Sequence, residues 1–278
     1  MMPILIVLSV LIAVYSVTRP GAMEGVKYFL VPNVKNFSWM TVVAAMGQMF
    51  YSLSIAMGIL ITFGSYMKKE TSLEDSTRNV EVFDTAIAIM AGLMIIPAVF
   101  SFSGGDPDTL QAGPALMFIT IPKVFENMGF GTVVGILFFL LVLFAAVTSS
   151  IALTESAVST FEDELGWSRR RATVLVGVIM IALGSLSSLG YGPLVGIKII
   201  GMQFLDFFDF LTNSVMMPIA AMLTSLFVSR IVGMKRMEEE IMHGESTFRR
   251  KKIFIVMIKY LCPVFALIIL ISSVANAF

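Results

Sequence analysis

Seven long apolar runs, separated by shorter polar stretches, dominate the chain. They lie at residues 2–17, 40–63, 85–102, 131–157, 173–189, 200–228 and 253–274. A transmembrane helix needs about 20 predominantly apolar residues. The pattern therefore predicts an all-α integral membrane protein with seven transmembrane helices. The first run follows no basic segment and precedes no small-residue cleavage motif, so we interpret it as a spanning helix rather than a signal peptide.

Composition strengthens this interpretation and removes several function classes. Apolar residues make up 57% of the 278 positions, charged residues only 14%, and the mean hydropathy is +0.90. The formal net charge is zero, so nothing suggests nucleic acid as a partner. A single cysteine, Cys262, and a single histidine, His243, exclude a disulfide framework or a Cys/His metal site within one chain. No nucleophile–base pair is visible, and we do not expect an enzyme.

Positive residues gather in alternate loops. The loops after the second, fourth and sixth runs hold Lys68, Lys69, Arg78, Arg169, Arg170, Arg171, Arg230, Lys235, Arg236, Arg249, Arg250, Lys251 and Lys252. The intervening loops hold far fewer: Arg19, Lys27, Lys35, Lys123 and Lys198. Because cytoplasmic loops are enriched in Lys and Arg, we expect a multi-pass protein of the cell membrane with a cytoplasmic N-terminus and an external C-terminus.

The second run carries polar and small residues at its centre, from Gly47 to Gly58. Two interpretations are open. Small residues let transmembrane helices pack closely. Alternatively, the helix is broken there and lines a cavity, with freed carbonyls for a cation and amide dipoles for an anion.

Other polar residues inside the runs are candidate ion ligands. Thr148 and Ser149 are adjacent hydroxyls that suit a small hard cation, although such hydroxyls also bond to carbonyls one turn earlier. Asp84 lies near the inner membrane boundary, and Asp209 lies near the outer end of the sixth run. Intramembrane carboxylates are costly and usually mark an ion path or a gate; Asp206 also fits a headgroup-level position.

Two further segments do not span. Residues 103–122 are too interrupted to cross the bilayer and are predicted either to dip into an outer vestibule as a lid or to form a surface helix. Residues 235–252 are predicted to form a solvated cytoplasmic loop without chemistry of its own.

Several motifs together resemble one transporter family. Gly47-Gln48-x-Phe50-Tyr51-Ser52-Leu53-Ser54 resembles the sixth transmembrane helix of the neurotransmitter:sodium symporters, which include bacterial leucine-type transporters. Supporting motifs, in the same order, are Ser65-Tyr66 with Lys68-Lys69, Thr148-Ser149-Ser150-Ile151-Ala152 and Phe161-Glu162-Asp163-Glu164-Leu165. The resemblance spans the whole chain but corresponds to helices five to eleven of that family. It implies a leucine-transporter-type inverted-repeat fold with a complete second repeat and without helices one to four.

The resemblance implies sodium as the transported ion. Ser52 corresponds to a ligand of the first sodium site. Ala145, through its carbonyl, with Thr148 and Ser149, corresponds to half of the second site. Asp84 falls where many members place a sodium-coordinating Asn. A carboxylate there would supply fixed negative charge, so chloride is not expected, and Ala88 replaces the Ser of chloride-dependent members.

The resemblance also implies a small-molecule amino-acid substrate. The substrate-binding residues would be Phe50, Tyr51, Leu53, Ser54, Ala56, Met57 and Leu153. Of these, Tyr51 would be the aromatic lid, and Ala56 beside Met57 narrows the pocket in favour of an apolar or aromatic amino acid. Asp209 would be the outer gate carboxylate.

We expect a single membrane domain with three parts. Residues 1–38 would form helix five and an outer loop, residues 39–230 would form helices six to ten, and residues 231–278 would form a cytoplasmic loop and helix eleven. We expect this chain to need helices one to four as a partner, because they would supply the other half of both sodium sites. The chain is therefore expected to be a fragment of a sodium-dependent symporter. The rivals are a seven-helix receptor and a non-transporting membrane subunit.

Overall fold

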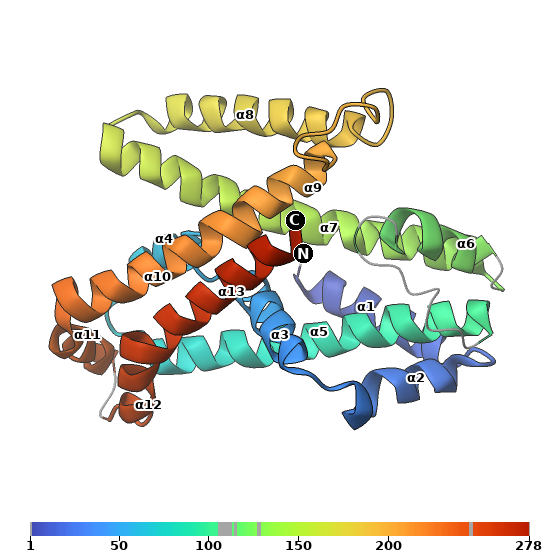
Figure 1. The fold of residues 1–278 in the computed structure, drawn as a ribbon, viewed down its shortest axis with the longest axis horizontal. Helices are drawn as coiled ribbons and strands as arrows, with labels where there is room; N and C mark the ends of the chain where they lie inside the picture. The colour runs from blue at the N-terminus through green and yellow to red at the C-terminus, as the bar shows by residue number, and fades with distance from the viewer. Residues whose placement is uncertain (1, 105–112, 114–115, 127–128, 245–246, 278) are drawn as a thin grey trace. The chain divides into compact units, whose positions relative to one another are not determined.

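The computed structural model describes residues 2–104, 113, 116–126, 129–244 and 247–277. Its helices are α1 (Met2–Val17), α2 (Ala22–Leu30), α3 (Trp39–Ser52), α4 (Ile59–Ser65), α5 (Leu73–Ser103), α6 (Ile121–Glu126), α7 (Gly131–Leu165), α8 (Arg169–Leu189), α9 (Phe204–Asp209), α10 (Met217–Phe227), α11 (Met234–Ile241), α12 (Lys251–Val256) and α13 (Cys262–Ala277). Short 3₁₀ turns and π-helical segments link some of them. Figure 1 shows these helices joined by loops.

Five of the described helical segments are long and apolar enough to cross a membrane. They are Leu73–Ser103, Gly131–Leu165, Arg169–Leu189, Phe204–Ile241 and Lys251–Ala275. A sixth span results if Pro3–Val17 and Ala22–Leu30, which meet at 115°, count as one broken span. The structure thus confirms a multi-helical membrane architecture, whereas the count of seven stays a prediction.

The helices belong to two compact units, Met1–Phe37 with Glu81–Ser150, and Ser38–Val80 with Ile151–Phe278. The core of the first unit joins α1, α5, α6 and α7. Its fully buried side chains include Val99 of α5 and Ile121 and Val124 of α6. Ser16 of α1, itself buried, donates a hydrogen bond of 2.8 Å to the Met94 carbonyl of α5. This bond satisfies a hydroxyl that would otherwise be costly in an apolar interior.

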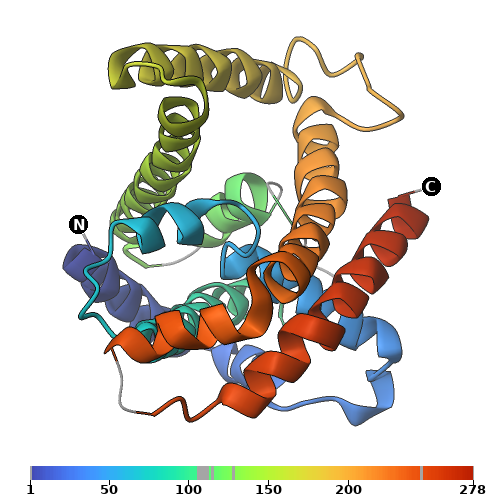
Figure 2. The same ribbon diagram turned by 90° about the vertical axis from the view of Figure 1, so that its left-hand side faces the viewer.

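The core of the second unit lies among α3, α10 and α13. Phe50, Met217, Ala221, Ala266 and Ile269 form it. Figures 1 and 2 both show α10 and α13 running side by side, and their residues are in contact along this pair.

A proline follows one π-helical segment of the second unit. A π-helical segment, Met257–Leu261, precedes Pro263. Pro263 has no N–H for the carbonyl five residues earlier, which is the acceptor in a π-type turn. That carbonyl, of Ile258, receives a 2.8 Å hydrogen bond from the Ser225 hydroxyl of α10 instead. The two helices are thereby tied together by a polar contact as well as by packing.

The stretch predicted as a cytoplasmic loop, residues 235–252, contains most of a short helix, α11, which was not identified from the sequence. Met234, Met237 and Ile241 recur at helical spacing, and Ile241 is buried. Lys235 and Arg236 each precede a glutamate by four residues, a spacing that favours a helix. These local signals explain why residues 234–241 are helical.

The segment predicted as a lid or surface helix is described only in part, because residues 105–112 lie outside the described residues. Its described portion is helical, with a π-helical segment, Leu116–Thr120, that leads into α6. Because Ile121, Val124 and Phe125 are buried in the core of the first unit, α6 is a packed element and not a free surface helix.

We predict that Gly25→Ala destabilises the first unit. A Cβ at Gly25 would lie 2.9 Å from the Pro97 Cα and 3.1 Å from the Ile96 carbonyl oxygen, both backbone atoms of α5. Overpacking of this kind costs about 1 to 3 kcal/mol. Thermal unfolding in detergent, followed by circular dichroism, measures the loss. The matched control is Gly177→Ala in α8, where no atom lies within 4 Å. Equal unfolding midpoints for the two variants would contradict the packing of α2 against α5.

Candidate functional site: a broken helix beside a polar cavity

The apolar run at 40–63 is not one helix. α3 ends at Ser52 and α4 begins at Ile59, and the two are drawn as separate helices in Figure 1. Between them Ser54, Ala56 and Gly58 have positive φ angles of 53°, 65° and 81°. The structure therefore confirms the broken-helix interpretation, and the alternative of a continuous helix packed through small residues is wrong for this run.

Local sequence explains where α3 starts and where α4 starts. Ser38 caps α3 reciprocally with Thr41: the Ser38 hydroxyl accepts from the Thr41 N–H, and the Thr41 hydroxyl accepts from the Ser38 N–H. Gly58, at the N-cap of α4, adopts the left-handed region that glycine tolerates without strain. Ser54 and Ala56 have a Cβ and therefore hold strain, a feature that clusters at functional sites.

A cavity of about 310 Å³ lies beside the broken helix, in the second unit. Its lining residues are Gly47, Gln48, Phe50, Tyr51, Asp209, Asn213, Ser214, Met217, Pro218, Ile269 and Ser273. Three residues assigned by resemblance, Phe50, Tyr51 and Asp209, thus line one cavity. An apolar wall with a few convergent polar groups is typical of a small-molecule site.

The cavity's carboxylate is held by a neighbour one turn away. Asn213 donates a hydrogen bond of 2.6 Å to the Asp209 carboxylate. The pair spans the start of a π-helical segment, Phe210–Met216, and π-type turns are frequent at functional sites. Gln48 and Ser273 also line the cavity without having been assigned a role from sequence. For both residues the signal was a polar side chain inside an apolar run.

Some of the other predicted substrate-binding residues lie near the cavity lining, and one does not. Ala56 and Met57 pack against the buried cluster around Phe50. Leu53 and Ser54 belong to the break itself and are partly buried. Leu153 lies on α7, is 48% exposed, and is not among the residues that line the cavity.

The predicted sodium ligands of α7 are close to one another. The Thr148 hydroxyl lies 2.9 Å from the Ala145 carbonyl oxygen and 3.1 Å from that of Phe144. The back-bonded arrangement weighed from sequence is thus present, and it also places a hydroxyl and a carbonyl oxygen side by side. Ser149 is exposed, and Asp84 is half-buried about three turns into α5. These residues belong to the first unit, whereas Ser52 belongs to the second.

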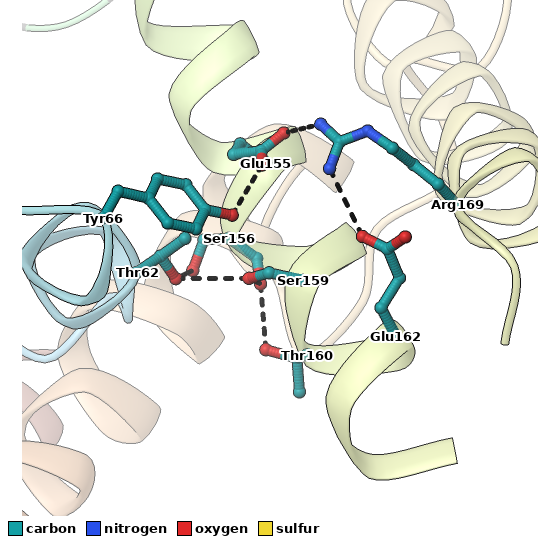
Figure 3. Close-up of polar contacts among 8 residues, drawn as sticks. All are labelled: Thr62, Tyr66, Glu155, Ser156, Ser159, Thr160, Glu162 and Arg169. Atoms are coloured by element: carbon teal, nitrogen blue, oxygen red, sulfur yellow. Dashed lines mark hydrogen bonds and ion pairs between the residues drawn. The ribbon is translucent and has the colours of Figure 1, made fainter. Parts of the chain in front are cut away.

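Sequence reasoning missed a second polar cluster, shown in Figure 3, that joins α4, α7 and α8 within the second unit. Tyr66 donates a 2.7 Å hydrogen bond to Glu155. Arg169 lies 2.5 Å from Glu155 and 3.3 Å from Glu162. The motif Ser65-Tyr66 had been noted only as a family signature, and Glu155 carried no periodic signal because its partners are remote in sequence.

Electrostatics favour the neutral form of Tyr66. The hydrogen bond to the Glu155 carboxylate raises the pKa of the phenol above its ordinary value, and desolvation and the negative charge of Glu155 act in the same direction. Tyr66 therefore keeps its proton and acts as a donor to the carboxylate.

A set of contacts between hydroxyl groups lies one helical turn from the Tyr66 cluster (Figure 3). Thr62, which is buried, lies 3.4 Å from the hydroxyl oxygens of both Ser156 and Ser159. Gly58 approaches the same place, because a Cβ there would lie 2.7 Å from the Ser156 hydroxyl oxygen. The second half of the broken helix is thus seated on α7 by small and hydroxyl-bearing residues.

Bilayer-length helices, together with a helix that is broken at strained residues beside a cavity, are typical of a secondary membrane transporter. The chain belongs to the sodium:neurotransmitter symporter family, whose profile matches residues 1–277. This membership confirms the resemblance and makes the chain a multi-pass membrane protein of a transporter family, which ends the receptor interpretation.

Individual proteins similar to this chain are consistent with this family membership. The chain is 35% identical over 246 residues to the uncharacterized sodium-dependent transporter YhdH of Bacillus subtilis, covering 88% of this chain and 54% of that protein. It is 32% identical over 274 residues to an uncharacterized sodium-dependent transporter of Haemophilus influenzae, covering 98% and 59%. Its backbone matches the crystal structure of MhsT in complex with L-phenylalanine, with a TM-score of 0.83 and 35% identity, over 98% of this chain and 61% of that one. The chain thus spans a little over half the length of these relatives.

We predict that Gly58→Ala destabilises the break between α3 and α4. An alanine at φ +81° costs about 1 to 2 kcal/mol, and its Cβ would collide with the Ser156 hydroxyl. Thermal unfolding in detergent measures the loss. The double variant Gly58→Ala/Ser156→Ala removes the collision but not the φ strain, so it should recover part of the stability. Additive effects of the two substitutions would contradict the close approach of α4 to α7.

Proposed function

We propose that this chain contributes the substrate cavity and part of the sodium sites of a sodium-coupled amino-acid symporter. The observation that carries the proposal is the cavity beside the broken helix, lined by Phe50, Tyr51 and Asp209. Family membership supports sodium as the coupling ion. The whole transport activity is proposed of the protein together with segments that correspond to helices one to four of the family.

The substrate we propose is an apolar or aromatic amino acid. The cavity wall offers Phe50, Met217 and Ile269 as apolar surface and Tyr51 as an aromatic lid. The similar protein MhsT has been crystallised with L-phenylalanine, which supports the same class here. Asp209 and Gln48 are the polar groups that would face the opening or the substrate's charged end.

The proposed sodium ligands are Ser52, Asp84, Ala145, Thr148 and Ser149. The pairing of the Thr148 hydroxyl with the Ala145 carbonyl supports part of this set, because both are oxygen ligands and lie 2.9 Å apart. Sodium binding would reorient the Thr148 hydroxyl, so that its lone pairs face the ion. Chloride is not required in this proposal, because the Asp84 carboxylate supplies the fixed negative charge.

The proposed cycle follows from differential affinity. Sodium and substrate bind together to an outward-open state. The inward sodium gradient then drives the change to an inward-open state. A ligand shifts such an equilibrium only as far as its affinities for the two states differ. The proposed topology, with the N-terminus cytoplasmic and the C-terminus external, places the Tyr66 cluster at the cytoplasmic side and the Asp209 cavity at the external side.

We predict that Thr148→Val lowers the affinity for sodium. Loss of one polar partner of a charged group costs about 1.5 to 3 kcal/mol, which raises the sodium concentration for half-maximal uptake about 10- to 150-fold. The measurement is sodium-dependent uptake of L-phenylalanine into proteoliposomes that contain the chain together with the segments corresponding to helices one to four. The matched control is Thr160→Val, since Thr160 also bonds to a carbonyl one turn earlier on α7. Equal sodium dependence in both variants would contradict the assignment of Thr148.

A second prediction concerns chloride. In the same preparation, which includes the segments corresponding to helices one to four, wild-type uptake should be the same in chloride and gluconate buffers, because Asp84 provides the negative charge. Asp84→Asn removes that charge, and uptake in chloride-free buffer should fall at least about tenfold, the effect of roughly 1.4 kcal/mol. Full uptake by Asp84→Asn without chloride would disprove the role of this carboxylate. Chloride-dependent uptake by the wild type would disprove the wider proposal of chloride independence.

A further inference from the structure

Three consecutive arginines at the start of α8 have different surroundings. Arg169 is paired with Glu155 and Glu162. Arg170 and Arg171 are both exposed, and within the described residues neither guanidinium forms an ion pair or a hydrogen bond. Two unpaired guanidinium groups on consecutive residues leave their donors available to an anion that both can bind.

A surface hollow lies next to these two arginines. Its volume is about 820 Å³, and its lining residues are Trp167, Ser168, Arg170, Arg171, Val174, Leu175 and Val178. All belong to the second unit. The hollow therefore has a basic end and an apolar end along the same helix, about 12 Å apart from Arg170 to Val178 at 1.5 Å per residue.

The apolar end faces away from the protein. Ala172 and Val176 bury the opposite face of α8 against Val158 of α7. Val174 and Val178, by contrast, are 60% and 59% exposed. Exposed valines beside arginines suit the depth at which a lipid headgroup meets its acyl chains, with the arginine heads in the polar layer.

Trp167 closes the basic end. Its indole stacks on Phe161 with ring centroids 5.6 Å apart and 16° between the planes, so it is fixed in place. Indole rings concentrate at the headgroup level of membranes. The first-turn N–H groups of α8 add to the positive potential at this end, because Ser168 makes no side-chain cap to them.

We propose that this hollow binds an anionic phospholipid of the cytoplasmic leaflet. The phosphate is held by the guanidinium groups of Arg170 and Arg171, and one acyl chain lies along Val174 and Val178. A phospholipid matches both ends, whereas a free phosphate matches only the basic end and an apolar helix only the other. Charge complementarity therefore selects the lipid as the occupant.

The experiment is a lipid titration of the full chain, purified in detergent and observed by native mass spectrometry. The probes are dioleoyl phosphatidylglycerol and dioleoyl phosphatidylcholine, which differ in headgroup charge and not in acyl chains. Phosphatidylglycerol should bind more tightly. Arg170→Gln/Arg171→Gln should weaken that binding about 30-fold, because each basic residue near an anionic headgroup contributes about a factor of five, and binding of phosphatidylcholine should be unchanged.

The matched control is Lys68→Gln/Lys69→Gln, which removes the same two charges from exposed loop positions. It should change phosphatidylglycerol binding by less than about threefold, because screened charges away from the site act weakly. Val174→Ser/Val178→Ser should weaken both lipids. Arg170→Lys/Arg171→Lys keeps the charge and should retain most of the binding, which separates loss of the site from loss of the fold.

Several outcomes would overturn the proposal. One is equal affinity for the two lipids, and another is an unchanged affinity in Arg170→Gln/Arg171→Gln. An equal loss in the Lys68/Lys69 control would show a general charge effect. Displacement of the lipid by inorganic phosphate alone would identify a free anion as the occupant, and indifference to Val174→Ser/Val178→Ser would remove the acyl chain from the hollow.

Discussion

The hydrocarbon core of a bilayer contains no water to satisfy an unpaired backbone group, and the architecture of this chain follows from that constraint. Helices satisfy their own N–H and C=O groups, which is why long apolar helices dominate the structure. A helix interrupted at six consecutive residues, 53–58, is admissible only where protein or a cavity takes over the freed groups. The break between α3 and α4 is therefore the feature around which the neighbouring helices are arranged.

Each half of the broken helix has its own support in the second unit. Phe50 of α3 is buried against α10 and α13. Both helices also line the cavity, together with Asp209 of α9 and Asn213. α4 packs on α7 through Gly58 and Thr62, where both helices carry small or hydroxyl-bearing residues in place of large side chains. The two halves are held by different partners, and two residues between them, Ser54 and Ala56, have strained positive φ angles. Strain that is fixed by packing on both sides leaves the backbone groups of the break oriented for binding.

Much of this arrangement was predictable from sequence, and the reasons are local. The run at 2–17 coincides with α1, because its apolar length specifies the helix, and the run at 173–189 ends where α8 ends, at the residue before Gly190. The break was foreseeable from Gly58 and the polar residues before it. The positive φ angles of Ser54 and Ala56 were not, because residues with a Cβ adopt such angles only where tertiary packing imposes them. α11 was missed because its charges suggested a loop, while its apolar spacing was the better indicator.

The polar clusters show the other limit of sequence reasoning. Asp209 and Asn213 are four residues apart, so helical periodicity brings them together. Tyr66, Glu155 and Arg169 are 89 and 14 residues apart, and only the packing of α4, α7 and α8 makes them neighbours. The same packing separates Arg169 from Arg170 and Arg171, which are indistinguishable in sequence. One arginine faces two carboxylates inside the unit, and the next two face outward, because α8 turns by about 100° per residue and only one of three successive side chains can point toward α7.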